Sequence, residues 1–309
     1  MRRQRGVALL TALLVVALVA IIGAGMLSHM NLAAHRSGNL WLSEQAWWYA
    51  VGVENWAGQI LARDARDNDI DSLDQAWAQP VDYLPIEGGG IQGRLLDLQG
   101  RINLNNLAGA DADAAMNRLQ RLIEVVTEAD VIVARRIAQG VRDWIDQDIN
   151  PTLPDGAEDD YYLGLSPAYR TGNQPMASPS ELRAVREVTG PMYDLLEPHI
   201  AALPAGTAIN VNTATAPVLA SLHEGLDLAA AQALVERREE APWDSVQAFL
   251  QEGELAGLDI DAQGLSVASS YFLATGRVTV GRAQLTFHSV LHRSGQDRVR
   301  VLRHSRDVR

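Results

Sequence analysis

Residues 7–27 of the chain, VALLTALLVVALVAIIGAGML, form one uninterrupted apolar run. These 21 residues carry no charge, and Thr11 is their only clearly polar side chain. An α-helix of this length measures about 30 Å, which matches the hydrocarbon thickness of a bilayer. The run is longer than the apolar segment of an ordinary cleaved signal peptide, and helix-compatible sequence follows it directly. We therefore expect a single membrane-spanning helix.

A short basic leader precedes this run, with arginine at positions 2, 3 and 5 and glycine at position 6. Basic residues hold the flank of a membrane helix in the cytoplasm, so residues from about 30 onward are expected in a periplasm-like compartment. The chain contains no cysteine. Its absence excludes disulfides, zinc–thiolate sites, iron–sulfur clusters and thiol catalysis.

The overall charge argues against nucleic acid as a partner. Of 309 residues, 26 are basic, all of them arginine, and 38 are acidic, which gives a net charge of −12. Such a chain is repelled by phosphate backbones over most of its surface. The composition therefore favours a protein partner, and the length allows one large domain or two ordinary ones.

The helix is expected to continue beyond the membrane, over residues 31–66. Three tryptophans and a glycine follow one another at spacings of 7, 4 and 4, which places them on one stripe: Trp41, Trp48, Gly52 and Trp56. Such a stripe is normally the core-facing side of an amphipathic helix. We therefore expect it to pack against a sheet.

The leader and the start of the apolar run resemble a known signal. A basic leader that ends in Gly6 and is followed at once by Val7-Ala8-Leu9-Leu10-Thr11 is similar to the class III signal of type IV pilins and type II secretion pseudopilins. The resemblance implies that a prepilin peptidase removes residues 1–6 by cutting after Gly6 and that the new N-terminal Val7 is methylated. Glycine suits a cut site because it has no side chain to exclude.

One position departs from the pilin pattern. Pilins carry glutamate at the fifth mature position, where this chain has Thr11. The minor pseudopilin K branch of type II secretion lacks this glutamate and is unusually large, so the chain resembles that branch. A bulky subunit without the glutamate fits poorly into a repeating shaft, where an unpaired N-terminal charge is costly and a large head would clash.

The resemblance implies a function and a place in the cell. It implies a minor pseudopilin at the tip of the type II secretion pseudopilus that initiates or caps assembly and contributes to protein export across the outer membrane. Its partners would be other minor pseudopilins in a tip complex, the major pseudopilin and the prepilin peptidase. It would be a single-pass protein of the bacterial inner membrane with its globular part in the periplasm, and not an enzyme.

The rest of the chain predicts an α+β fold. Residues 91–104 alternate around Gly100 and predict two short strands, and residues 105–144 change to helical spacing. Ser178-Pro179-Ser180-Glu181 is a capping box that starts a helix. From residue 266 the period becomes two, which predicts three or four antiparallel strands.

We expect a pseudopilin fold, in which a long N-terminal helix packs on an antiparallel sheet, with a large all-α insertion. The expected segments are the long helix, the first part of the sheet domain, the inserted helical head and the strands that complete the sheet, at residues 7–66, 67–104, 105–265 and 266–309. The last segment holds eight arginines against two aspartates, a net charge of +6. This basic tail suits an acidic partner surface or the membrane, although charges on strand faces are commonly just solvated.

Residues 206–255 resemble a helix-hairpin-helix, or SAM-like, unit. Such units often bind DNA through a hairpin with two glycines, but here Gly225 is followed by Leu226 and Asp227, so an anion replaces the second glycine. We expect a packing role and no nucleic-acid partner, and we keep a membrane-anchored DNA-binding or DNA-uptake protein as the alternative. The sequence Ile102-Asn103-Leu104-Asn105 resembles Ile209-Asn210-Val211-Asn212, which indicates an internal duplication.

An acidic stretch between positions 143 and 160 suits inorganic chemistry. It holds seven carboxylates: Asp143, Asp146, Asp148, Asp155, Glu158, Asp159 and Asp160. Like charges at this density repel one another unless they are solvated or neutralised by a cation. The alternating oxygen side chains of Asp146-Gln147-Asp148-Ile149-Asn150 are typical of the start of a calcium loop. It is not an EF-hand, because Pro151 and Ala157 stand at the sixth and twelfth positions.

Charge alone leaves a solvated loop and a calcium site open. The resemblance to pseudopilin K, a family that binds calcium in its helical head, favours structural calcium, because residues 143–146 and 157–162 are similar to the family's loop. It implies ligands at Asp146, Asp148, Glu158 and Asp159, with Asn150 and Asp160 as further candidates.

Signals of catalysis are weak. His223-Glu224 begins like a metalloprotease motif, but Asp227 stands where the second histidine belongs. Gly88-Gly89-Gly90 is followed by no phosphate-binding lysine and predicts a turn. The acidic stretch has no nearby histidine or lysine to support hydrolysis by a bound metal. We therefore expect no enzymatic activity.

Overall fold

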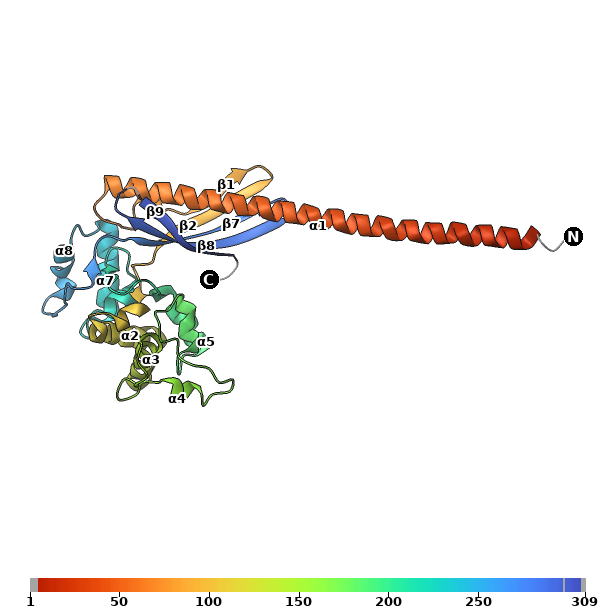
Figure 1. Ribbon diagram of the computed structural model, residues 1–309. Helices are drawn as coiled ribbons and strands as arrows, with labels where there is room; N and C mark the ends of the chain where they lie inside the picture. The colour runs from red at the N-terminus through yellow and green to blue at the C-terminus, as the bar shows by residue number, and fades with distance from the viewer. Residues whose placement is uncertain (1–4, 297, 307–309) are drawn as a thin grey trace.

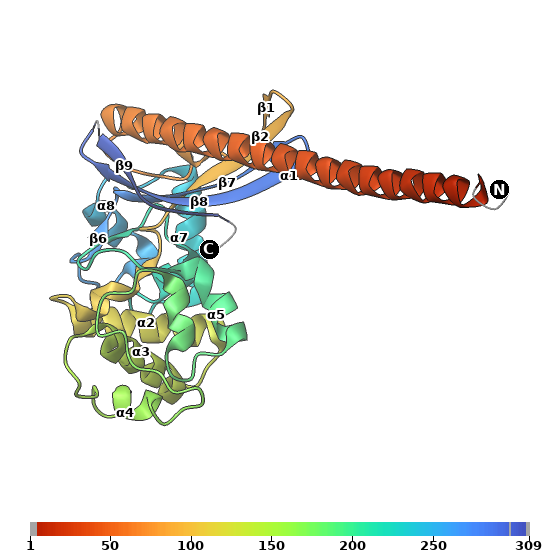
Figure 2. The same cartoon turned by 45° about the vertical axis from the view of Figure 1, so that its right-hand side comes forward.

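The structure is a computed structural model that describes residues 5–296 and 298–306. It has three parts: a long N-terminal helix, a sheet along the far half of this helix, and a helical head on the other side of the sheet (Figure 1). A view turned by 45° shows the head standing off to one side of the helix (Figure 2). The fold is α+β, as predicted.

The long helix α1 runs over Arg5–Asp67. In the described part of the chain it is the one helix that is long and apolar enough to cross a membrane. Its most apolar stretch has a mean hydropathy of 2.9, and no part of that stretch is buried. α1 is therefore compatible with a single-pass anchor. Arg2 and Arg3 of the leader lie outside the described residues.

Five antiparallel strands form the sheet in the order β1-β2-β7-β8-β9. Their bounds are β1 (Val81–Ile86), β2 (Gly89–Asp97), β7 (Tyr271–Val280), β8 (Ala283–Ser294) and β9 (Arg298–Arg306). Apolar side chains on one face of the sheet pack on α1 and form a core: Ile91, Leu95, Phe272, Val278, Phe287 and Leu291. Because β2 and β7 are neighbours in the sheet, the head is inserted between two adjacent strands.

The tryptophan stripe of α1 does not face the sheet, so that prediction is wrong. Trp41, Trp48 and Trp56 expose 76%, 64% and 42% of their surface. The face that packs on the strands carries small residues, with Ala46 and Ala50 fully buried. Small side chains let the helix backbone approach the strands closely, which a row of indoles would prevent. Both faces of α1 are apolar, and periodicity alone does not say which of them meets the sheet.

The head occupies the chain between β2 and β7 and is mainly helical. Its α-helices are α2 (Ala112–Thr127), α3 (Val131–Ile145), α4 (Asp159–Tyr162), α5 (Gly190–Leu196), α6 (Ala216–Ala220), α7 (Leu228–Glu240) and α8 (Val246–Leu250). Its short strands are β3 (Ile102–Asn103), β4 (Ile200–Ala201), β5 (Ile209–Asn210) and β6 (Leu265–Ser266). The 3-10 helices are η1 (Ala76–Ala78), which precedes β1, and within the head η2 (Leu104–Ala108), η3 (Pro179–Ala184), η4 (Glu197–His199) and η5 (Gly253–Leu255). The capping box at Ser178 is present and starts η3.

The head consists of two units that begin in the same way. β3 pairs in parallel with β4 at the end of the first unit, and β5 pairs in parallel with β6 at the end of the second. Asn105 follows β3, and its side-chain amide bonds both the N–H and the C=O of Met176. Asn212 follows β5 and bonds Trp243 in the same manner. The repeated Ile-Asn-x-Asn sequence therefore marks a structural repeat.

Within residues 206–255, α6 and α7 form a helical hairpin. Asp227, which stands in place of the second glycine, caps α7 by accepting a hydrogen bond from the N–H of Ala230 at 2.8 Å. The connecting residues 221–227 contain two carboxylates and no arginine. The two carboxylates would repel a phosphate backbone, which weakens the DNA-binding alternative.

Buried polar residues join the head to the sheet. The carboxylate of Asp97, at the end of β2, accepts hydrogen bonds from the hydroxyls of Thr213 and Ser269, both at 2.6 Å. Burial raises the pKa of Asp97 to about 6 despite these bonds. The N–H of Ser269 also donates to Asp71, which pairs with buried Arg293 of β8 at 2.5 Å. This network fixes the position of the head relative to the sheet.

Candidate metal centre

The acidic loop begins where α3 ends and is closed by a buried aspartate. Asp143, in the last turn of α3, accepts hydrogen bonds from the N–H groups of Thr152 at 2.9 Å and Ala157 at 2.6 Å. Burial raises the pKa of Asp143, although these bonds favour its charged form. A Cβ at Gly156 would lie 2.2 Å from a carboxylate oxygen of Asp143, so glycine is required at this close approach. Asp143 therefore folds the loop back onto the end of the helix.

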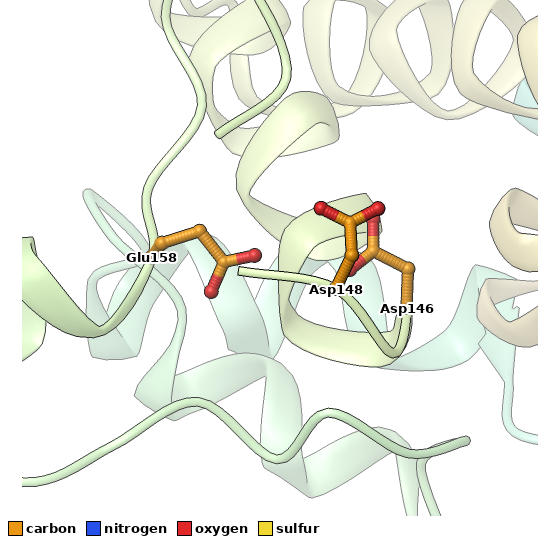
Figure 3. Close-up of side chains that lie close together, drawn as sticks. All are labelled: Asp146, Asp148 and Glu158. Atoms are coloured by element: carbon orange, nitrogen blue, oxygen red, sulfur yellow. The ribbon is translucent and has the colours of Figure 1, made fainter. Parts of the chain in front are cut away.

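Three carboxylates converge in this loop. Asp146 follows the last residue of α3, Asp148 lies in the next turn, and Glu158 comes from the segment just before α4. Each offers a carboxylate oxygen within 4.8 Å of the other two. Figure 3 shows the three side chains around a common space, with Glu158 reaching in from the opposite side. The fold thus brings the two ends of the loop together.

The electrostatics of this cluster suit a cation. Burial, reinforced by the neighbouring carboxylates, raises the pKa of Asp146 to about 6 and that of Glu158 to about 7. One carboxylate oxygen of Asp146 and one of Glu158 are buried and accept no hydrogen bond from the residues that the structure describes. Buried acceptors in proteins nearly always have a partner. Two such oxygens in an oxygen-rich cluster fit the ligands of Ca²⁺.

The other predicted ligands lie around the cluster. The carboxylate of Asp159 accepts hydrogen bonds from the N–H and the hydroxyl of Thr171, both at 3.1 Å. The side-chain amide of Asn150 donates to Asp148 at 3.0 Å. Asp160 is exposed in α4. The structure therefore gathers Asp146, Asp148 and Glu158 into one group of carboxylates and leaves Asp159 and Asp160 outside it. Asn150 contacts this group through its hydrogen bond to Asp148.

Sequence reasoning missed the roles of Asp143 and Thr171. Asp143 lies four residues after Gln139 on the buried face of α3, where a carboxylate without partners is costly. That spacing is a signal that Asp143 is structural. The hydroxyl of Thr171 donates to Glu158 at 3.3 Å from an irregular segment, where no sequence pattern predicts such a contact.

Comparison with known proteins gives the family. Sequence models described as "Type II secretion system (T2SS), protein K" match residues 100–205 and 209–268, which correspond to the two units of the head. The type II secretion system protein K of Pectobacterium carotovorum is 36% identical over 309 residues, which cover 95% of this chain and 94% of the relative. The chain belongs to the type II secretion system protein K family.

Other members of the protein K family agree with this assignment. The protein K of Pseudomonas aeruginosa is 35% identical over 310 residues, which cover 97% of this chain and 92% of the relative. A chain in the crystal structure of the GspK-GspI-GspJ complex from enterotoxigenic Escherichia coli is 30% identical and similar with a TM-score of 0.80, covering 89% of this chain and 100% of that chain. The resemblance to minor pseudopilin K of type II secretion is confirmed. In this family member, the acidic cluster belongs to the first of the two head units.

Proposed function

We propose that the protein is a minor pseudopilin at the tip of the type II secretion pseudopilus, where it initiates or caps assembly and contributes to protein export across the outer membrane. The observation that carries the proposal is the position of the head, which stands beside the sheet near the end of α1 remote from its N-terminus (Figures 1 and 2). A shaft repeats one contact between successive subunits, so every subunit must leave the same space free. The head, residues 98–270, would occupy the space that the next subunit of the shaft needs. A subunit at the end of the filament has no such neighbour on one side, so a terminal position accommodates the head.

A single label on the head tests this position. The chain contains no cysteine, so Gln251→Cys at an exposed site in the head introduces one reactive thiol. Gold attached to this thiol should appear at the ends of pseudopili formed with overproduced major pseudopilin. A cysteine placed in the major pseudopilin is the control and should label filaments along their length. Head label distributed along the shaft would contradict a terminal position.

We infer that the partners are other minor pseudopilins, which form a tip complex with this protein, and the major pseudopilin. The similar solved chain comes from a complex of GspK, GspI and GspJ. Exposed Trp41 and Trp48 support the inference, because large apolar side chains left in solvent mark interaction surfaces. A helix of another pseudopilin, anchored in the same membrane, would run alongside this face of α1.

We further propose that a prepilin peptidase cleaves after Gly6, that Val7 becomes a methylated N-terminus, and that the sheet and head lie in the periplasm beside the inner membrane. The basic leader and the unburied apolar helix support this placement. The test is the intact mass and N-terminal peptide of membrane-extracted protein, expressed with and without the peptidase. We expect an N-terminus at Val7 that depends on the peptidase. An uncut Met1 under both conditions would contradict the proposal.

We also propose calcium as a structural cofactor of the head. Asp146, Asp148 and Glu158 would hold the ion, and the remaining candidate ligands are Asn150, Asp159 and Asp160. The ion would neutralise the cluster and tie the end of α3 to the start of α4. The two buried carboxylate oxygens without hydrogen-bond donors among the described residues support this proposal.

A further inference from the structure

A groove separates the head from the outer face of the sheet, the face turned away from α1. It encloses a cavity of about 320 Å³. Figure 2 shows the head beneath β7 and β8. Tyr193 of α5 lines the cavity from the side of the head. The floor of the groove consists of residues that pair across β2, β7, β8 and β9. The register of the sheet therefore determines which floor residues are neighbours.

The floor of the groove is apolar in the middle and basic at both ends. Leu96, Leu273 and Val290 are paired neighbours on β2, β7 and β8, and all three are half-buried. Val290 pairs in turn with Arg303 on β9. At the opposite end of the groove, Arg94 of β2 lies two residues before Leu96 and is exposed. The groove therefore offers an apolar strip between two guanidinium groups.

Both guanidinium groups can accept a further partner. Among the described residues, the side chain of Arg94 has no hydrogen-bond or ion-pair partner. Arg303 donates to the carbonyl oxygen of Ala177, which uses one of its five N–H donors. Of the cavity-lining residues that the structure describes, Glu197 is the one carboxylate, against Arg94, Arg303 and a third arginine, Arg101. The groove is thus basic in a chain whose net charge is −12.

The position of the groove identifies the kind of partner. Arg94 also borders a smaller cavity with Trp56 and Ile60, which places the groove level with this part of α1. Trp56 lies about 44 Å beyond Leu27 along the helix, at 1.5 Å per residue. Lipid headgroups at the end of the apolar span are then many Debye lengths away, since one is about 8 Å. This position favours an anionic polypeptide over lipid as the partner.

Strand geometry sets the spacing of the partner's side chains. Three strand intervals of about 4.8 Å separate β2 from β9, and Arg94 lies two residues along the strand from the row that ends at Arg303, so the backbones of the two arginines are about 16 Å apart. In an extended polypeptide, residues i and i+4 are about 13–14 Å apart and face the same side as residue i+2. The long side chains of arginine and glutamate span the remaining distance. Two carboxylates at i and i+4 would reach the two arginines, and the residue at i+2 would lie over the apolar strip.

The geometry points to a binding site for an extended acidic segment of a partner polypeptide, with carboxylates at positions i and i+4 and an apolar side chain at i+2. The carboxylates form charge-assisted hydrogen bonds with Arg94 and Arg303. The apolar side chain packs on Leu96, Leu273 and Val290. This site goes beyond the tip assignment, because the groove lies on the face of the sheet turned away from α1, which carries Trp41 and Trp48.

A labelled peptide tests the site on the full chain in detergent micelles. The probe is fluorescein-linked Ser-Glu-Ser-Leu-Ser-Glu-Ser, and its binding is followed by fluorescence anisotropy. We expect saturable binding that weakens as salt is raised. Arg94→Gln and Arg303→Gln should each lower the affinity by about tenfold. Arg277→Gln is the matched control, because Arg277 is exposed on the outer face of β7 outside the groove, and it should leave the affinity unchanged.

Comparison peptides make the outcome decisive. The peptide with glutamine for both glutamates should lose most of its binding, and so should the peptide with serine for leucine. Three outcomes would each overturn the proposal. The glutamine peptide could bind as tightly as the probe, the Arg94→Gln/Arg303→Gln double variant could bind the probe as tightly as the wild type does, or the probe could fail to bind. Displacement of the probe by phosphatidylglycerol vesicles would assign the site to lipid and would also overturn it. Circular dichroism spectra of the variants establish that they are folded.

Discussion

Asp146 and Glu158 are the residues on which the calcium proposal depends most directly. Asp146→Asn and Glu158→Gln preserve the size of each side chain and remove a charge that the cation requires. We expect isothermal titration calorimetry of the full chain to show calcium binding that each substitution weakens by about tenfold or more. Asp194→Asn, at an exposed aspartate paired with Arg183 elsewhere in the head, is the control and should bind as the wild type does. Unchanged heats in both cluster variants would place the ion elsewhere.

Asp97 predicts a pH dependence of stability. Its pKa of about 6 lies above the ordinary value of 3.8, so the folded state holds this proton more tightly than the unfolded chain does. The resulting stabilisation is present at low pH and is lost as the pH rises through about 6. Asp97→Asn removes this titration.

Urea denaturation of both proteins measures the effect. Between pH 5 and pH 7.5, the free energy of unfolding of the wild type should fall by about 1.4 kcal/mol relative to that of Asp97→Asn. The comparison cancels the titration of carboxylates that both proteins share. A difference between the two proteins that stays constant with pH would show that Asp97 does not titrate in this range.

At the scale of the element, the two faces of α1 predict opposite responses to substitution. Trp41→Ala and Trp48→Ala change exposed side chains, so each should alter the free energy of unfolding by less than about 0.5 kcal/mol. Both should reduce co-purification with co-expressed minor pseudopilins. Ala50→Leu overpacks the buried face and should destabilise the protein by about 1–3 kcal/mol. A tryptophan variant that is strongly destabilised, or that still co-purifies fully, contradicts this division of the helix.

The elements that could be predicted from sequence are those whose own residues show a pattern typical of a helix, a helix start or a strand. The apolar run and its continuation predicted the course of α1, the capping box predicted the start of η3, and the period of two predicted β7 to β9. The edge strand β1 was not predicted. Most of its residues are exposed and it contains Pro85, so it shows no alternation, and it forms because β2 offers a partner.

The candidate metal site likewise has one part that the sequence predicted and one part that it did not. The spacing of Asp146 and Asp148 indicated an oxygen-rich turn, and both residues belong to the cluster. The inclusion of Glu158 and not Asp159 depends on how Asp143 folds the loop, and on Thr171, which engages the carboxylate of Asp159. Such contacts arise from tertiary structure, so the local sequence does not specify them.

At the scale of the whole molecule, the joint between head and sheet depends on a buried ion pair. The side chains of Arg293 and Asp71 are 8% and 2% exposed. Arg293→Met leaves the carboxylate of Asp71 buried without its cation and should lower the free energy of unfolding by about 3–5 kcal/mol. Arg293 also pairs with the buried carboxylate of Asp64 at 3.4 Å. Adding Asp71→Leu therefore removes one of the two unpaired charges and should restore part of the loss. Denaturation of the two variants measures both effects, and a double variant less stable than Arg293→Met would refute this account of the joint.

The insertion of the head also determines the order in which the molecule folds. β2 and β7 are paired neighbours, as in a hairpin, yet residues 98–270 separate them. Closing so long a loop costs about 3 kcal/mol more than closing a four-residue turn. A folded head removes most of that cost, because it brings the N–H of Leu98 to 3.0 Å from the carbonyl oxygen of Tyr271, where the sheet is joined. We therefore expect the head to fold before the sheet closes, and until then the chain presents β2 as an open edge to any strand that can pair with it.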